Sequence, residues 1–322
     1  MLFVSSLAVG WISYQWYQYQ HTPIVHQPIN YTLTPGTSFT ALVHDLKRRN
    51  IIFNMYFVTS LARLQGIAKY IKAGEYEFYP GMTARELMQV LTTGQVVRHK
   101  VTLIEGWTFK EVLNELNANS KLQHQLTGLS FGAIMQRLGY PGQYPEGMFF
   151  PDTYFFITSS SDVEILQRAY ATMQRVLQQE WITRAAGLPY SSPYEALILA
   201  SLIEKETAVP SERPIVADIL LKRIDQRMRL QVDPTVIYGL GDFYKGALTR
   251  QDLKFDSPYN TYLHKGLPPT PIAMPSASAI EAALHPAQTD YWYFVAKGDG
   301  SHAFSTTLRE HINAIHQYRH KN

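Results

Sequence analysis

An almost wholly apolar stretch predicts a buried helix over Pro193–Glu206. Ser192 precedes this stretch as a helix N-cap, a proline occupies the first helical position, and Glu195 completes a Ser-x-x-Glu capping box. Ser201 is the only polar side chain from residue 196 to residue 203, and a helix that is apolar on every side is normally buried. We therefore expect the C-terminal end of this helix to emerge from the protein core.

Alternation of apolar and polar residues, followed by a turn and helical spacing, recurs three times, at residues 31–38, 76–83 and 101–108. In each repeat a glycine in the turn is followed two residues later by a Ser or Thr that can cap the next helix. Small strand–turn–helix modules of this kind resemble the LysM domain, which binds chitin-like and peptidoglycan glycans. We predict a LysM-like module over residues 30–100, with a purely structural role as the alternative.

The second half of the chain is predicted to be mainly helical. Apolar residues at helical spacing indicate helices over residues 162–180 and 212–227. Near the C-terminus, two aromatic-rich runs at 291–296 and 301–305 flank a Gly-Asp-Gly turn, which predicts a β-hairpin. The expected fold class is α+β.

The first residues form an apolar, aromatic-tipped segment, and no Asp, Glu, Lys or Arg appears before Asp45. This composition predicts a membrane anchor over residues 1–20 and an extended linker over residues 21–29. The apolar run of about 16 residues is short for a span of roughly 20 and lacks a basic flank, so we expect the true start to lie upstream. An amphipathic or buried N-terminal strand is the alternative. The expected interfacial belt consists of Trp16, Tyr17 and Tyr19.

Composition excludes several classes of function. The net charge of +3 is too small to imply nucleic acid as a partner. The chain has no cysteine, which excludes disulfides, thiolate catalysis and cysteine metal sites. The sequence also lacks a zinc-binding His-Glu-x-x-His helix, a Gly-x-Ser-x-Gly elbow, a phosphate loop and a calcium loop. We therefore expect no metal and no cofactor.

The candidate chemistry lies at the end of the buried helix, in Glu204 and Glu206. Two residues are separated by about 200° around a helix, so the two side chains point to nearly opposite sides. A helix C-terminus and burial both disfavour a negative charge, and we expect them to raise the pKa of a carboxyl and make it a general acid. The alternative is that both glutamates only cap the helix by meeting Lys205, Arg213 or solvent.

The remaining polar chemistry is typical of a sugar-binding cleft. The chain contains 21 Tyr and 5 Trp, and flat rings beside amides and carboxylates bind the apolar faces and polar groups of sugars. The same aromatic residues also suit an ordinary core.

Five motifs follow one another along the chain from residue 146. They are EGMFFPDTY at 146–154, ASLIEKET at 200–207, LQVDPTVIYG at 230–239, YNTY at 259–262 and GLPPTPI at 266–272. Together they resemble the endolytic murein transglycosylases, the MltG or YceG-like family. The resemblance implies a single-pass protein of the bacterial inner membrane with a LysM-like module and a lysozyme-like catalytic domain, here residues 101–322, in the periplasm. It implies cleavage of MurNAc–GlcNAc bonds within nascent peptidoglycan strands, leaving 1,6-anhydroMurNAc ends and terminating elongation beside peptidoglycan synthases.

In that family the catalytic glutamate belongs to the Ile-Glu-x-Glu-Thr segment, which corresponds to Glu204 here. A single acid suffices, because the C6 hydroxyl of the sugar itself replaces water as the nucleophile. A hydrolytic muramidase and a non-catalytic peptidoglycan-binding scaffold are the alternatives. The residues expected to bind the glycan are Glu146, Glu206, Gln231, Tyr259, Asn260 and Tyr262.

Overall fold

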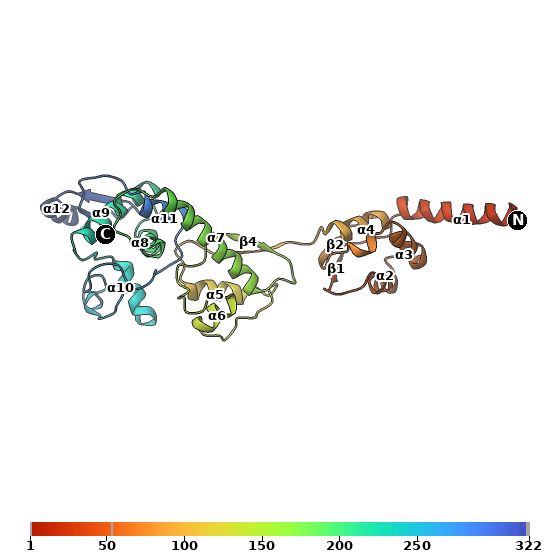
Figure 1. Ribbon diagram of the computed structural model, residues 1–322, viewed down its shortest axis with the longest axis horizontal. Coiled ribbons are helices and arrows are strands. Elements are labelled where there is room, and N and C mark those ends of the chain that lie inside the picture. Colours follow the sequence, from red (N-terminus) through yellow and green to blue (C-terminus); the bar gives the residue numbers. More distant parts are fainter. Residues whose placement is uncertain (1, 53, 320–322) are drawn as a thin grey trace. The chain divides into compact units, whose positions relative to one another are not determined.

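The computed structural model describes residues 2–52 and 54–319, and Figure 1 labels its elements. The described residues form an α+β structure, as the sequence predicts. The helices are α1 (Leu2–His21), α2 (Phe39–Arg48), α3 (Met55–Leu64), α4 (Ala84–Thr93), α5 (Phe109–Ala118), α6 (Phe131–Leu138), α7 (Asp162–Thr183), α8 (Pro193–Glu206), α9 (Arg213–Asp225), α10 (Asp233–Leu240), α11 (Ala277–Leu284) and α12 (Leu308–Arg319). The strands pair two by two: β1 (Ile29–Leu33) with β2 (Gly74–Phe78), β3 (His99–Thr102) with β4 (Thr153–Phe156), and β5 (Tyr293–Ala296) with β6 (His302–Ser305).

The N-terminal unit comprises the described part of residues 1–100 together with residues 120–123 and 155–161. Its strands β1 and β2 pair antiparallel, with Tyr31 opposite Tyr76. Ser38 and Thr83 cap α2 and α4, and Thr83 forms the predicted capping box with Glu86. These caps confirm the strand–turn–helix repeat, whereas the LysM-like nature of the unit stays a prediction.

The predicted N-terminal membrane segment over residues 1–20 is wrong. Residues 2–21 do form the helix α1, but no helix among the described residues is both long and apolar enough to cross a bilayer. The physical reason is the last two turns of α1, where Gln15, Gln18 and His21 dilute the apolar run. The alternative of a strand also fails, since the segment is helical and Tyr19 is buried against the N-terminal core.

The C-terminal unit comprises residues 101–119, 124–154 and the described residues from 162 onward. Its central element is α8, which contacts α7, α9, α10 and α11 and lies among them in Figure 1. All of its residues from Ala196 to Ile203 are buried, which confirms the prediction of a core helix. One detail differs: Ser192 makes no capping bond, and Glu195 instead accepts from the backbone and hydroxyl of Ser191.

The other predicted elements of this unit are also present. Thr108 and Glu111 form the capping box at the start of α5, and β5 and β6 form the expected antiparallel hairpin. Gly147 has a φ of 77°, and a Cβ built on it would lie 2.4 Å from Cβ of Pro271. The backbone around residue 147 therefore packs directly on the 271 turn, a contact that any side chain would prevent.

Candidate active site

The C-terminal turn of α8 opens onto a cavity of about 720 Å³, which we call the acid cavity. Glu204 and Lys205 contribute to it from α8, and the turn before α5 contributes Glu105 and Gly106. The remaining lining residues are Thr102, Leu103, Ile104, Pro151, Asp152, Thr153, Ala208 and Arg213. The buried helix thus delivers a carboxyl group to an open cavity, as its apolar pattern predicts.

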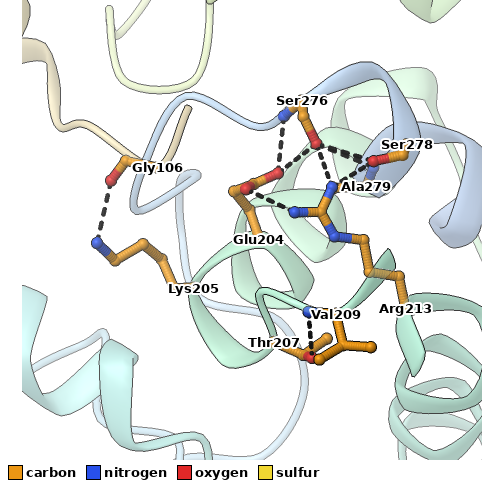
Figure 2. Close-up of polar contacts among 9 residues, drawn as sticks. All are labelled: Gly106, Glu204, Lys205, Thr207, Val209, Arg213, Ser276, Ser278 and Ala279. Carbon is orange, nitrogen blue, oxygen red and sulfur yellow. Dashed lines mark hydrogen bonds and ion pairs between the residues drawn. The ribbon is translucent and has the colours of Figure 1, made fainter. Parts of the chain in front are cut away.

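Glu204 is held on both of its carboxyl oxygens (Figure 2). Oε1 accepts from Nη2 of Arg213 at 2.9 Å, and the side chains of both residues are only 6% exposed. Oε2 accepts from the backbone N–H of Ser276 at 2.9 Å and from its hydroxyl. Ser276 is also the N-cap of α11, so the carboxyl group lies at the positive end of that helix as well as beside a guanidinium.

Arg213 joins several elements at this point. Besides Glu204 it donates to the hydroxyls of Ser276 and Ser278, as Figure 2 shows. It is the first residue of α9, and the preceding turn is held by Glu212, whose Oε2 accepts from the hydroxyl of Thr207 at 3.0 Å. Burial alone would raise the pKa of Glu212. Hydrogen bonds with His302 and Thr207 outweigh burial and keep this pKa below its ordinary value.

Lys205 fixes the opposite wall of the acid cavity. Its Nζ donates to the backbone carbonyl of Gly106 at 3.0 Å and so ties the end of α8 to the turn that precedes α5. The backbone N–H of Gly106 in turn donates to the carbonyl of Met274. The turn before α5 is therefore fastened both to the end of α8 and to the chain at residue 274.

Glu206 points away from Glu204, as the two-residue spacing predicts. Its Oε2 is buried, and burial, with a smaller contribution from the charge of Asp233, raises the pKa of Glu206 to about 8. Arg223 lowers the pKa but does not compensate for burial. Oε2 of Glu206 has no hydrogen-bond partner within residues 2–52 and 54–319. Glu206 is therefore a neutral core acid and does not line the acid cavity.

Glu146 is a second buried acid outside the acid cavity. Burial raises its pKa to about 7, although Tyr238 and Phe109 donate to it and lower the value. The phenol of Tyr238 lies 2.9 Å from Oε2, and the backbone N–H of Phe109 lies 2.8 Å from Oε1. Glu146 thus fastens the start of α5 to α10.

The other residues predicted to bind the glycan serve local structure in the free protein. Asn260 is fully buried and its amide donates to the carbonyls of residues 253 and 255. Tyr262 donates to Asp233, and Tyr259 shares a hydrogen bond of 2.9 Å with Thr270. Gln231 has a φ of 56°, and its backbone N–H donates to the carbonyl of residue 261. None of these side chains lines the acid cavity.

From the sequence, Arg213 is expected only as a helix-capping partner, and neither Ser276 nor Ser278 is expected at the site. Nothing in the motif spacing places residues 276 and 278 beside residue 204. A serine before an eight-residue apolar helix does signal an N-cap, and this was the available clue. Asp152 belongs to the EGMFFPDTY motif but was not among the predicted site residues, and it lines the acid cavity. In the part of the chain that the structure describes, no group of three His, Asp or Glu side chains could hold a metal ion.

Comparison with known proteins gives a consistent result. Residues 31–317 match the model of the family described as YceG-like. An endolytic murein transglycosylase of Bacillus subtilis is 30% identical over 307 residues, covering 90% of this chain and 84% of the relative. One of Streptococcus pneumoniae is 27% identical and is matched over half its length. The crystal structure of a YceG-like protein of Listeria monocytogenes superposes with a TM-score of 0.56 and 28% identity, covering 89% of this chain and 99% of that one.

Proposed function

The chain belongs to the YceG-like family, and we propose on that premise that it is a lytic transglycosylase that cleaves glycan strands of peptidoglycan from within. The relative from Bacillus subtilis bears the name endolytic murein transglycosylase and is matched along most of its length. The activity acts on the cell wall. Cleavage at MurNAc–GlcNAc bonds, with 1,6-anhydroMurNAc ends, is the specific reaction we propose.

One observation carries the assignment of the acid. Glu204, within the ASLIEKET motif, is the carboxyl that a buried helix delivers to a cavity, while the neighbouring Glu206 is enclosed in the core. A cavity of about 720 Å³ lies within the ordinary range for a ligand site. We therefore propose Glu204 as the catalytic residue.

The proposed reaction uses this one carboxyl twice. Glu204 gives a proton to the glycosidic oxygen as the bond breaks, and the N-acetyl oxygen of the substrate stabilises the positive charge that develops on the sugar. The resulting carboxylate then takes the proton of the C6 hydroxyl, which attacks the anomeric carbon and closes the anhydro ring. The proton taken from the C6 hydroxyl replaces the one given to the leaving oxygen of the neighbouring sugar, so Glu204 is regenerated and no water is consumed.

Arg213 and Ser276 have defined roles in this scheme. After proton donation, Glu204 carries a negative charge that Arg213 and the N-terminus of α11 stabilise. The two hydrogen bonds from Ser276 fix Oε2, which restricts the rotamer of the carboxyl. A glycan that covers the acid cavity excludes water from the reacting groups.

A hydrolytic muramidase is the second candidate, and Asp152 is the observation that favours it. Asp152 lines the same cavity as Glu204 and is exposed, so a second carboxylate is available to activate water. Its Oδ1 accepts from the backbone N–H of Thr153 at 2.6 Å. The two mechanisms differ in their products rather than in their requirement for Glu204.

The catalytic assignment is tested by Glu204→Gln, which keeps the size of the side chain but removes the transferable proton. We expect this variant to remain folded, with a lower melting temperature because the buried Arg213 loses its charged partner, and to lose roughly a hundred- to ten-thousandfold in cleavage of isolated strands. Glu206→Gln should cleave strands, and Glu281→Gln, on the exposed face of α11, is the matched control. Wild-type activity of Glu204→Gln would reject Glu204 as the acid.

Two finer expectations belong to this proposal. The first is that peptidoglycan synthases are partners of this protein. The second is that the protein terminates strand elongation, because an endolytic cut ends a growing strand. Co-purification of the full chain with a synthase tests the first expectation, and the glycan-strand length in cells that lack the protein tests the second.

A further inference from the structure

A second cavity of the C-terminal unit has a volume of about 600 Å³, and we call it the tyrosine cavity. Tyr144, Tyr170 and Tyr194 contribute aromatic rings to its wall, and Gln143 and Gln174 contribute amides. None of the described residues that line it is charged. This contrasts with the acid cavity, whose lining includes three carboxylates and two cations. The tyrosine cavity therefore suits an uncharged ligand with apolar faces and polar edges.

Two side chains in this wall have hydrogen-bonding capacity for such a ligand. The amide nitrogen of Gln174 is buried and has no partner in the described part of the chain. An unpaired buried amide is costly, and a small shift of the side chain would allow it to donate to a ligand oxygen. Gln143 uses its amide oxygen to accept from Tyr170 at 2.8 Å, and this bond orients its amide nitrogen as a donor.

Glu146 and Tyr259 are linked to the lining of the tyrosine cavity through Tyr238 and Thr270. Tyr238 donates to Glu146 and packs edge-on against Tyr259 with ring centroids 4.8 Å apart. Tyr259 is hydrogen-bonded to Thr270, which lines the tyrosine cavity. Glu146 and Tyr259, which the sequence predicts to bind the glycan, therefore support the lining of the tyrosine cavity and do not line the acid cavity.

One segment of chain joins the two cavities. Thr270 lines the tyrosine cavity, the backbone N–H of Ile272 donates to Ser201 of α8, and Ser276 donates to Glu204. On α8 itself, Leu197 of the tyrosine cavity and Glu204 of the acid cavity are seven residues apart, hence within about 20° on one stripe and about 10 Å apart along the axis. Both cavities therefore lie along the same side of α8.

We propose that the tyrosine cavity is a second saccharide site, which binds a neutral N-acetylated stretch of the strand that is cut at Glu204. The proposal rests on the proposed function for the identity of the ligand. Sugar rings would pack on Tyr144 and Tyr194, and N-acetyl and hydroxyl oxygens would accept from Gln143 and Gln174. The uncharged wall argues against the stem peptides of peptidoglycan, whose carboxylates and amines would be desolvated there without a partner.

The test measures binding of a neutral N-acetylglucosamine oligomer to the full chain carrying Glu204→Gln, so that no cleavage occurs during the titration. Tyr144 is 41% exposed, so Tyr144→Ala removes one ring at the cavity rim, and Gln143→Trp fills the rim from another exposed position. We expect either change to raise the dissociation constant by roughly three- to tenfold, the loss typical of one aromatic contact. Tyr144→Phe keeps the ring and should restore the affinity.

The matched control is Phe243→Ala, which removes a 75% exposed aromatic side chain from the same unit outside both cavities and should leave the dissociation constant unchanged. Parent-like affinity of folded Tyr144→Ala and Gln143→Trp would overturn the second site while leaving the cleavage reaction intact. Failure of the wild-type protein to cut any strand would instead reject the proposed function. Binding that requires the stem peptides would identify a peptide site and overturn the saccharide assignment.

Discussion

Replacing Glu206 by Gln should change how the stability of the protein depends on pH. The pKa of Glu206 in the folded chain is about 8, against an ordinary value of 4.5, because burial disfavours the carboxylate. Between these two values the folded protein keeps a proton that the unfolded chain loses. The stabilisation that comes with the neutral acid is fully present below pH 4.5, decreases above it, and is gone once the pH passes about 8.

The size of this effect follows from the two pKa values. Each pH unit in the interval lowers the free energy of unfolding by about 1.4 kcal/mol. Over the interval from 4.5 to about 8 the loss from Glu206 is about 5 kcal/mol, which is a large part of the total stability of a domain. Gln fills the same space without titrating, so the Glu206→Gln variant should be less sensitive to alkaline pH than the wild type.

The assay is urea unfolding of both proteins at half-unit steps from pH 5 to 9, followed by intrinsic fluorescence. The quantity of interest is the difference in unfolding free energy between variant and wild type, because titration of all other groups cancels in it. This difference should move steadily in favour of Glu206→Gln as the pH rises and then level off. Glu281→Gln, an exposed substitution, should give a flat line. Parallel curves for wild type and Glu206→Gln would refute the buried neutral acid.

Three further predictions follow from individual contacts. Glu146, with a pKa of about 7, is protonated in the folded chain well above 4.5, so Glu146→Gln should remove a loss of stability of about 3 kcal/mol between pH 4.5 and 7, seen in the same urea series. Arg213→Ala leaves Glu204 without its buried partner and should destabilise the protein by about 3 to 5 kcal/mol, measured as a lower melting temperature; an unchanged value would mean that the ion pair is unimportant. Gly147→Ala should lower the urea midpoint much more than a Gly→Ala change at residue 128, because both have positive φ but only residue 147 would clash with Pro271; equal shifts would contradict the close packing.

Local sequence signals predicted the elements of the fold well where the structure is decided locally. The capping boxes at Thr83 and Thr108 and the apolar α8 follow from spacing alone, and all three are present. The predicted membrane segment is wrong because three glutamines, Gln15, Gln18 and Gln20, lower the mean hydropathy of α1. The hydropathy summed over the whole helix reflects them, whereas the apolar run at its start does not.

The candidate site shows where sequence reasoning ends. The motif and the helix end singled out Glu204, but its partners Arg213 and Ser276 lie at the starts of two other helices that packing brings to it, and Ser278 contacts it only through these two residues. Tertiary contacts of this kind leave no periodic signal. Asn260 belongs to the YNTY motif, but its amide donates to backbone carbonyls in the core. The motif therefore identified the residue without revealing whether its side chain binds a ligand or stabilises the fold.

The most direct test of the proposed reaction is the fate of solvent oxygen during cleavage by the wild-type protein. Isolated strands are digested in water enriched in heavy oxygen, and the new glycan ends are examined by mass spectrometry. If the C6 hydroxyl is the nucleophile and Glu204 acts alone as acid and then base, the new ends are anhydro sugars without the label. Reducing ends that carry the label in proportion to cleavage would contradict the account, because water activated by a second carboxylate such as Asp152 would then be the nucleophile.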